Sequence, residues 1–283
     1  MTVRLPLRTP LGGLQYREIV LLQGPSGWGE MSLLPGYPCD PARARAAAEE
    51  AACGTWPRPR RDSIPVNGIV PAVAPDQAAA LAAGFTTVKV KVGDPGDVDR
   101  VAAVRSAMGA GGRIRVDANG AWDVDTALAT IARLARYDLE LVEQPVASME
   151  DLATVRRRMT AAVPIAADEC VRDVDDARRL RPMEAADVVV LKVQPLGGVA
   201  AGLAVAEAAG MPALVSSMFE SSVGLAAGVA LAAALPDLPY ACGLGSAALL
   251  AADVVADPLV PVDGWLAVRR VAPDPELVAR FSV

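Results

Sequence analysis

Residues 86–93 read TTVKVKVG. β-Branched residues alternate with two lysines and a glycine ends the run, a pattern that predicts a short β-strand. Side chains two positions apart point to the same face of a strand, so Lys89 and Lys91 are expected side by side. Two ammonium groups about 7 Å apart on a buried face would repel each other. The strand is therefore either a solvated edge protected by charge or part of a site that uses two amines.

Lysine is rare in this chain. Only three of the 27 basic residues are lysine, namely Lys89, Lys91 and Lys192. Arginine stays protonated at any physiological pH, whereas a lysine amine can be tuned to gain and lose a proton. Codon bias is an alternative reason for an arginine-rich composition. Because two of the three lysines share one strand, we favour a role in proton transfer.

The composition excludes several classes of site. The 283 residues contain no histidine, which excludes histidine bases, Ser-His triads and most zinc sites. The net charge of −6 comes without a basic patch, so no nucleic-acid partner is expected. The four cysteines show neither metal-binding spacing nor a disulfide framework.

No membrane partner is expected either. The apolar residues form runs interrupted by charged residues, and none reaches the roughly 18 uninterrupted apolar residues of a membrane span. The first residues lack the apolar core of a signal peptide, which predicts a cytoplasmic protein. A length of 283 residues suits one large barrel or two ordinary domains.

Residues 1–62 predict a small α+β unit. Residues 3–7 and 16–23 alternate as strands, with a turn at residues 9–13 between them. Asp40 precedes a proline and an alanine-rich run, which predicts a helix with Asp40 as its N-cap.

From residue 63 onward, strands alternate with helices. Strands that are nearly continuous apolar runs, each followed by a helix, indicate a parallel sheet buried on both faces. Eight such units predict an α/β fold of the (β/α)8 barrel type. A doubly wound open sheet is the alternative, but no glycine fingerprint follows an early strand. The predicted strands are residues 64–67, 86–93, 113–117, 139–143, 163–168, 187–192, 212–217 and 240–245.

A polar residue ends each of the first seven predicted strands. Successive members of this set are 24, 26, 26, 25, 24 and 25 residues apart. A repeat near 25 residues is one β/α unit, so we expect all seven at the same height on their strands. In a barrel that height is the C-terminal mouth, where active sites lie. The seven residues are Asn67, Lys91, Asp117, Glu143, Asp168, Lys192 and Ser217.

Three acidic residues of this set come from successive strands: Asp117, Glu143 and Asp168. Carboxylates brought together must bind a cation or hold protons, because their charges repel. Oxygen ligands select a hard ion, so Mg²⁺ is the expected metal and Mn²⁺ the second choice. Glu169 competes with Asp168 for the third position, and the 25-residue step from Glu143 favours Asp168.

Lys91 and Lys192 are expected on opposite sides of this metal. A substrate carboxylate bound to the metal would have its α-carbon near both amines. One lysine would remove the α-proton, and Mg²⁺ would stabilise the resulting enediolate. Two other classes stay open. Lys192 could instead form a Schiff base in an aldolase, or the barrel could be a non-catalytic binding module.

In combination, these motifs resemble the enolase superfamily, and more closely its muconate lactonizing subgroup. The resemblance covers essentially the whole chain, and each motif alone would be a weak signal. The motifs that carry it are Lys89-x-Lys91, residues 116–119 with Trp122, residues 142–145, residues 167–169, residues 191–192 and residues 216–224.

The resemblance implies a role for each polar residue. Lys91 would be the base, Lys192 the second lysine and Lys89 a helper of Lys91. Enolase-superfamily sites use such a lysine together with Mg²⁺. The implied metal ligands are Asp117, Glu143 and Asp168.

The resemblance also implies two domains and a small-molecule carboxylate as substrate. Residues 1–62 with the tail at 255–283 would form a capping domain, and residues 63–254 the barrel. Arg115 lies on the same strand face as the acid at 117 and is either close to the lysines or part of a buried ion pair. The candidate substrate-binding residues are Asn67, Arg115, Ser217 and Gly243.

Four reactions are common in this subgroup: muconate cycloisomerisation, dipeptide epimerisation, N-acylamino acid racemisation, and the dehydration that forms o-succinylbenzoate for menaquinone synthesis. Dipeptide epimerases carry an acidic pair on the eighth strand, whereas residues 241–246 contain no carboxylate. Residues 27–30 and 34–37 resemble the capping loop that accompanies the dehydration. We therefore expect a Mg²⁺-dependent carbon–oxygen lyase, with N-acylamino acid racemisation as the alternative. The oligomeric state stays open.

Overall fold

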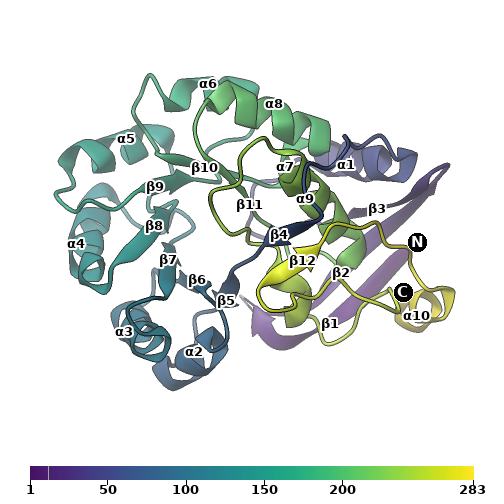
Figure 1. Cartoon of the computed structure of the whole chain (residues 1–283), viewed down its shortest axis with the longest axis horizontal. Helices are drawn as coiled ribbons and strands as arrows, with labels where there is room; N and C mark the ends of the chain where they lie inside the picture. Colours follow the sequence, from purple (N-terminus) through teal and green to yellow (C-terminus); the bar gives the residue numbers. More distant parts are fainter. Residues whose placement is uncertain (12) are drawn as a thin grey trace. The chain divides into compact units, whose positions relative to one another are not determined.

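The structure is a computed structural model that describes residues 1–11 and 13–283. Part of the turn predicted at residues 9–13 therefore lies outside the described residues. The chain forms two compact units, whose helices and strands are labelled in Figure 1. The first unit contains Met1–Val66, Leu191–Val205 and Val215–Val283, and the second contains Asn67–Val190 and Ala206–Leu214.

A parallel sheet organises the second unit. Its strands follow the order β11-β10-β9-β8-β7-β6-β5, so neighbours along the chain are also neighbours in the sheet. Most strand residues are buried, as expected for a parallel sheet that other layers cover. The strands are β5 (Gly68–Val70), β6 (Thr87–Lys91), β7 (Arg113–Asp117), β8 (Leu139–Glu143), β9 (Ile165–Ala167), β10 (Val188–Leu191) and β11 (Ala213–Val215).

The predicted α/β class with a parallel sheet is confirmed, but the first and the eighth predicted strands differ from the prediction. Residues 63–65 pair with residues 265–267 in a separate two-stranded sheet, so the parallel sheet begins only at β5. Among the described residues, the sheet has seven strands. Residues 240–245 form only isolated parallel bridges, from Cys242 to Val66 and from Gly243 to Ser216. The 3₁₀ helix η2 (Gly245–Leu249) already begins at the last residue of this segment, which leaves little extended chain for a ladder.

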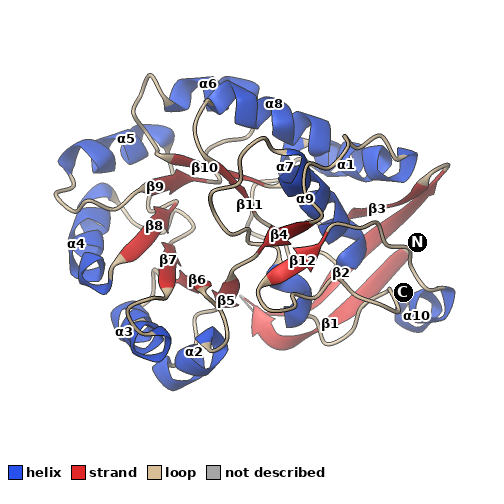
Figure 2. Cartoon of the chain, viewed as in Figure 1, coloured by secondary structure: helices blue, strands red, loops and turns tan. Residues whose placement is uncertain are grey.

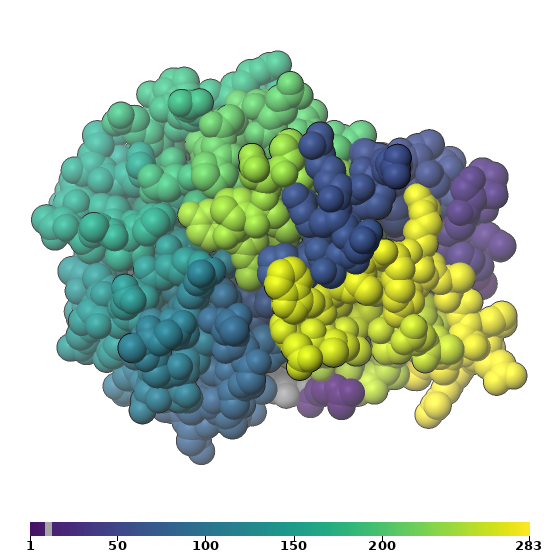
Figure 3. All heavy atoms as spheres, in the orientation of Figure 1, coloured from purple at the N-terminus to yellow at the C-terminus, as the bar shows by residue number. Residues whose placement is uncertain are grey.

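Helices cover the outer face of the curled sheet in the second unit (Figure 2). In the space-filling view, side chains of the α4 and α5 region form a continuous teal part of the surface (Figure 3). Across the described residues, none of the helices combines the length and the apolarity needed to cross a membrane. The helices that follow the strands are α2 (Pro75–Ala82), α3 (Asp97–Met108), α4 (Val124–Leu134), η1 (Ala135–Tyr137), α5 (Met149–Arg158), α6 (Val174–Leu180) and α8 (Val199–Ala209).

The register of the sheet confirms the predicted common height for three residues only. Lys91 pairs with Asp117, and Asp117 pairs with Glu143. Glu143 pairs with Ala166, so Asp168 lies two residues farther along its strand direction. Gly68 pairs with Val88, which places Asn67 at the level of Thr87, about 13 Å below the Lys91 level. Val188 pairs with Ala166, so Lys192 lies four residues beyond the Glu143 level. The prediction of one height was therefore wrong for Asn67, Asp168 and Lys192. Spacing along the chain counts loop and helix residues as well, whereas height depends only on backbone pairing.

The first unit contains an antiparallel sheet of β1 (Thr2–Leu11), β2 (Leu14–Gly24) and β3 (Gly27–Met31). The strands predicted at residues 3–7 and 16–23 are thus confirmed, with longer bounds. Asp40 caps α1 as predicted, because the backbone N–H of Ala42 donates to its side chain at 2.8 Å. The other elements of this unit are α1 (Pro41–Cys53), β4 (Ser63–Pro65), α7 (Val193–Leu196), α9 (Ser222–Ala234), β12 (Trp265–Ala267) and α10 (Pro275–Phe281).

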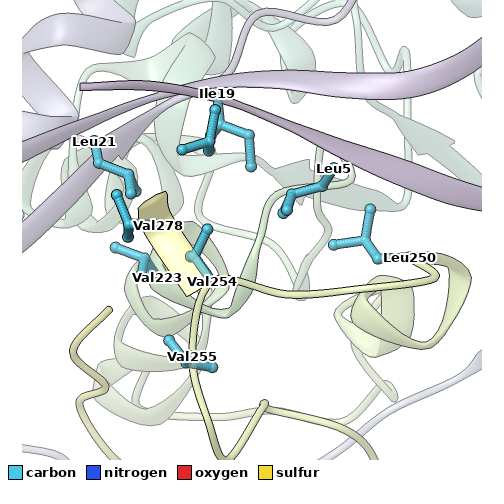
Figure 4. Packing of buried hydrophobic residues seen from close by; sticks show 9 residues of the cluster. Leu5, Ile19, Leu21, Val223, Leu250, Val254, Val255 and Val278 are labelled. Atoms are coloured by element: carbon cyan, nitrogen blue, oxygen red, sulfur yellow. The ribbon is translucent and has the colours of Figure 1, made fainter. Parts of the chain in front are cut away.

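A hydrophobic cluster joins the two ends of the chain within the first unit. Apolar side chains of β1 and β2 pack against α9, α10 and the segment that follows η2 (Figure 4). Each member is nearly or fully shielded from solvent, which makes this cluster a major source of stability for the unit. Its members are Val3, Leu5, Ile19, Leu21, Val223, Leu250, Val254, Val255 and Val278.

Helix α1 approaches β3 so closely that the contact requires glycine. A Cβ atom built on Gly29 would lie 1.8 Å from the carbonyl oxygen of Ala48. The face of α1 that meets the sheet consists of buried alanines, the smallest side chains that a helix can present while keeping a high helix propensity. Any side chain at position 29 would therefore push the helix away from the sheet.

We predict that Gly29→Ala lowers the free energy of unfolding by about 2 kcal/mol or more, because overpacking forces the backbone to move. Gly111→Ala is the matched control, since a Cβ there meets nothing within 4 Å. The control should change stability by no more than about 0.5 kcal/mol. Denaturant unfolding of the three proteins measures both values. Equal stability of the two variants would contradict the close approach.

Candidate active site

A charged cluster lies at the carboxyl ends of β6, β7 and β8. The Nζ atom of Lys89 is 2.9 Å from Oδ2 of Asp117 and 2.6 Å from Oε1 of Glu143. All three side chains are buried, so the charges attract strongly and each would be costly to bury alone. Lys89 therefore holds two buried carboxylates on neighbouring strands.

Lys91 reaches the same acid from a more exposed position. Its Nζ atom is 2.6 Å from Oδ2 of Asp117 and donates to Oδ1 of Asn119 at 2.6 Å. Its side chain is 22% exposed, against 7% for Lys89. The expectation that the two lysines emerge side by side is thus confirmed. Burial would raise the pKa of Asp117, but the two ammonium groups outweigh burial and hold that pKa well below its usual range.

Asn119 connects Lys91 to a second acidic position. Its side-chain amide donates to Oε1 of Glu169 at 2.8 Å, and its backbone N–H donates to Oδ1 of Asp117 at 3.0 Å. Its φ of 47° lies in the left-handed region, which asparagine tolerates better than most residues. The backbone conformation and the side-chain hydrogen bonds therefore both favour asparagine at this position after β7.

Gln144 ties the ends of β8 and β9 together. Its Oε1 accepts from the backbone N–H of Asp168 at 2.8 Å, and its Nε2 donates to the carbonyl of Val146 at 2.8 Å. The residue is fully buried and has a φ of 36°. Sequence reasoning gave Gln144 no role. Its place between Glu143 and a proline, at a predicted strand end, is the signal that could have found it.

The three acids match a hard metal ion by their chemistry. Asp117, Glu143 and Asp168 are buried carboxylates at the ends of successive strands, and Lys89 shows that this region stabilises positive charge. Oxygen donors of this kind suit Mg²⁺ or Mn²⁺. Within residues 1–11 and 13–283, no three His, Cys, Asp or Glu side chains are arranged as a metal site. Whether Asp168 or Glu169 completes the set stays a prediction.

Arg115 and Asn67 form a buried group of their own. Arg115 is ion-paired with Glu140, and its NH1 donates to Oδ1 of Asn67 at 3.3 Å. The Nδ2 of Asn67 donates to the carbonyl of Gly68. Of the two alternatives for Arg115, the structure contains the buried ion pair. A role for either residue in binding substrate stays a prediction.

The remaining predicted site residues belong to the first unit. Lys192 stands at the N-cap position of α7 and is 7% exposed. Ser217 is 8% exposed and follows β11. The backbone N–H of Gly243 donates to the carbonyl of Val215, so this N–H is already used within the fold. A Cβ on Gly243 would lie 2.5 Å from Oγ of Ser216, which explains the glycine.

A buried polar network in the first unit was missed by sequence reasoning. Both oxygens of Glu30 accept hydrogen bonds at the start of α9, from the backbone of Ser221 and Gly224. Burial raises the pKa of Glu30 to about 7, against the hydrogen bonds from Ser221 and Ser32, which favour the carboxylate. Arg17 donates to four backbone carbonyl groups: those of Ser32, Leu33, Met218 and Phe219.

Known proteins of the same architecture define the class. Residues 2–52 match the family model "Enolase N-terminal domain-like", and residues 73–273 match "Enolase C-terminal domain-like". The structure aligns with the muconate lactonizing enzyme from Pseudomonas putida with a TM-score of 0.88 and 23% identity, over 99% of this chain and 97% of the other. That likeness shows the fold. The chain is a member of the enolase superfamily.

Curated relatives identify the particular family. A Thermobifida fusca protein named o-succinylbenzoate synthase is 56% identical over 99% of this chain and 90% of its own length. A Mycobacterium leprae protein of the same name is 48% identical over 96% of this chain and 83% of its own length. The chain belongs to the family of the o-succinylbenzoate synthases.

We predict that Lys89→Met lowers the free energy of unfolding by about 3 kcal/mol or more, because it removes the ammonium group that pairs with Glu143 and leaves Asp117 paired with Lys91 alone. Arg113→Met on the adjacent strand is the control. Arg113 is 64% exposed and 3.8 Å from Glu140, so its removal should cost no more than about 1 kcal/mol. Denaturant unfolding without added divalent cations measures both variants. A Lys89→Met protein as stable as the control would contradict this assignment.

Proposed function

We propose that the chain dehydrates 2-succinyl-6-hydroxy-2,4-cyclohexadiene-1-carboxylate to o-succinylbenzoate, a step of menaquinone synthesis. The observation that carries the proposal is the row of Lys91, Asp117 and Glu143, paired side by side in a chain whose relatives carry that enzyme's name. Racemisation of N-acylamino acids, the alternative considered from the sequence, is not favoured by those relatives.

Lys91 acts as the base in this proposal. A base must reach the substrate, and Lys91 is the more exposed of the two strand lysines. Asp117 and Asn119 both bind its Nζ atom, which fixes where the amine points. In its neutral form, the amine takes the proton from the carbon that bears the substrate carboxylate. The same nitrogen then returns that proton to the departing hydroxide, which leaves as water and completes the aromatic ring.

Lys89 and Lys192 serve as fixed charges. Lys89 neutralises part of the negative charge at Asp117 and Glu143, so these acids do not repel the anionic substrate. Lys192 remains an ammonium group and stabilises negative charge that develops on the substrate. Arg115 with Asn67, and Ser217 with Gly243, are proposed to shape and line the substrate-binding region.

Asp117, Glu143 and Asp168 would hold Mg²⁺, or Mn²⁺ in its place. When bound, the metal would supply positive charge that stabilises the anionic form of the substrate carboxylate. Within this set, Gln144 keeps the backbone at Asp168 fixed relative to Glu143, since its side chain accepts from the Asp168 N–H.

The finer architecture is part of the same proposal. Residues 240–245 would supply the eighth strand position of a barrel at residues 63–254, and their two isolated parallel bridges support this. Residues 1–62 with the tail at 255–283 would form the capping domain. The packing of β1 and β2 against the C-terminal helix supports their joint assignment.

We predict that a chelator abolishes turnover of the dehydration substrate and that Mg²⁺ or Mn²⁺ restores it. Asp117→Asn and Glu143→Gln should also lose activity, without rescue at ordinary metal concentrations, because each removes a charged donor. Asp175→Asn, at a side chain 88% exposed, is the control and should keep full activity. Following the appearance of o-succinylbenzoate measures all five conditions: chelator, restored metal, the two variants and the control. Full turnover in excess chelator would rule out the metal assignment.

Arginine substitutions at Lys91 and at Lys192 distinguish the residue that acts as the base from the residue that acts as a fixed charge. Arginine keeps the positive charge but does not lose its proton near neutral pH. Lys91→Arg should reduce kcat on the order of 10³-fold or more, because it removes the base. Lys192→Arg should retain a measurable trace of dehydration. If Lys91→Arg turns over at a near-normal rate, the base is another group and the proposed mechanism fails.

A further inference from the structure

Lys192 and Tyr37 lie against each other in the first unit. The Nζ atom of Lys192 is 3.9 Å from the centroid of the Tyr37 ring. A cation within about 6 Å of an aromatic face is attracted by the ring's electrons, and more strongly when water is excluded. Lys192 is 7% exposed, so this contact is shielded from solvent. The ring therefore favours one position for the ammonium group.

A tight turn places the Tyr37 ring. The backbone N–H of Tyr37 donates to the carbonyl of Leu34 at 3.1 Å. Gly36 within this turn has a φ of 84°, in the left-handed region that glycine adopts without strain. The turn begins at Leu34, three residues after the end of β3, so the position of the ring depends on how residues 32–37 are attached to the rest of the unit.

Residues 32–37 are attached to α7, the helix whose N-cap is Lys192. Gln194, on α7, accepts from the backbone N–H of Ser32 at 2.8 Å and donates to its Oγ at 3.0 Å. Arg17 holds the carbonyl groups of Ser32 and Leu33 from β2. Ser32 and Gln194 thus join the segment with Tyr37 to α7. Along the chain, Gln194 is two residues from Lys192, and Ser32 is five residues from Tyr37.

The charge of the same ammonium also acts on Glu220. Burial raises the pKa of Glu220, and the charges of Arg17 and Lys192 oppose that rise. Glu220 itself is held by the backbone N–H of Met218 and by Gln194. Glu220 is thus itself fixed, and Tyr37 contacts Lys192 through its aromatic face.

We infer that Tyr37 is a positioning residue for Lys192, whose ring fixes the ammonium group in the place that the reaction uses. The inference rests on the proposed function, because Tyr37 acts on the substrate only through Lys192. The contact is made by the ring face, so phenylalanine should replace Tyr37 and leucine should not.

Steady-state kinetics of three variants test the role in the reaction. Tyr37→Leu should lower kcat about 10-fold while KM changes less than about 2-fold, and Tyr37→Phe should stay within about 2-fold of the wild type. Tyr16→Leu is the matched control, since Tyr16 makes a similar contact with Arg4 on an exposed strand, at 5.0 Å. The control should leave both constants unchanged.

The contact itself has an independent readout because the chain has only three lysines. Protein labelled with ¹³C-lysine gives three sets of ε-CH₂ signals, and Lys192→Arg identifies the set that belongs to Lys192. An aromatic ring shifts protons above its face upfield. The Lys192 ε-protons should therefore lie upfield in the wild type and in Tyr37→Phe, and should move downfield in Tyr37→Leu.

The two measurements separate this inference from the proposed function. An active wild type with an unaffected Tyr37→Leu variant, or with a Lys192 signal that Tyr37→Leu does not move, overturns the inference alone. A wild type that does not dehydrate the substrate overturns the proposed function and the role of Tyr37 with it. Loss of both the upfield shift and kcat in Tyr37→Leu, with rescue by phenylalanine, establishes the positioning role.

Discussion

Two buried carboxylates on neighbouring strands are the constraint on which the second unit depends. A single ionised carboxylate in a protein interior costs several kcal/mol, and two such groups also repel each other. Lys89 offsets that cost because its ammonium group lies within 3 Å of both Asp117 and Glu143. Once this pairing is made, Lys91, one strand pleat farther on, can contact Asp117 while its own side chain stays partly exposed. Lys89 is therefore the lysine that stabilises the buried carboxylates, and Lys91 is the lysine that stays partly exposed.

In the first unit, a buried carboxylate is stabilised by hydrogen bonds instead of by an ammonium group. The Glu30 carboxylate accepts from the N–H groups that open α9, where the helix dipole also favours negative charge. Arg17 satisfies carbonyl groups on two separate segments, at residues 32–33 and 218–219. These contacts join parts of the chain that are about 200 residues apart, so the loop that carries Ser217 is specified by polar groups on the N-terminal strands.

Much of the site was predictable wherever local pattern and sheet register coincide. The positions of Lys91, Asp117 and Glu143 were predicted correctly because each residue ends a short apolar strand. In these three strands, residues that are equally spaced along the chain are also paired in the sheet. The same rule failed for Asn67, Asp168 and Lys192, whose strands start or end at a different level. Gln144 and Tyr37 lie in stretches that the sequence singles out, but their individual roles were not predicted because these depend on contacts that only the folded chain creates. The eighth strand was predicted from its composition, yet its glycines and the following 3₁₀ helix leave only two bridges.

The scarcity and burial of lysine have a chemical consequence for the whole molecule. Apart from the N-terminal amine, the only primary amines are Lys89, Lys91 and Lys192, and each has most of its side chain shielded. Acyl donors that modify surface lysines on most proteins find no such surface target on this chain. A lysine-directed protease likewise meets its three cleavage points only inside or next to strands. An acyl group found on a lysine side chain of this protein would therefore mark a residue of the proposed active site.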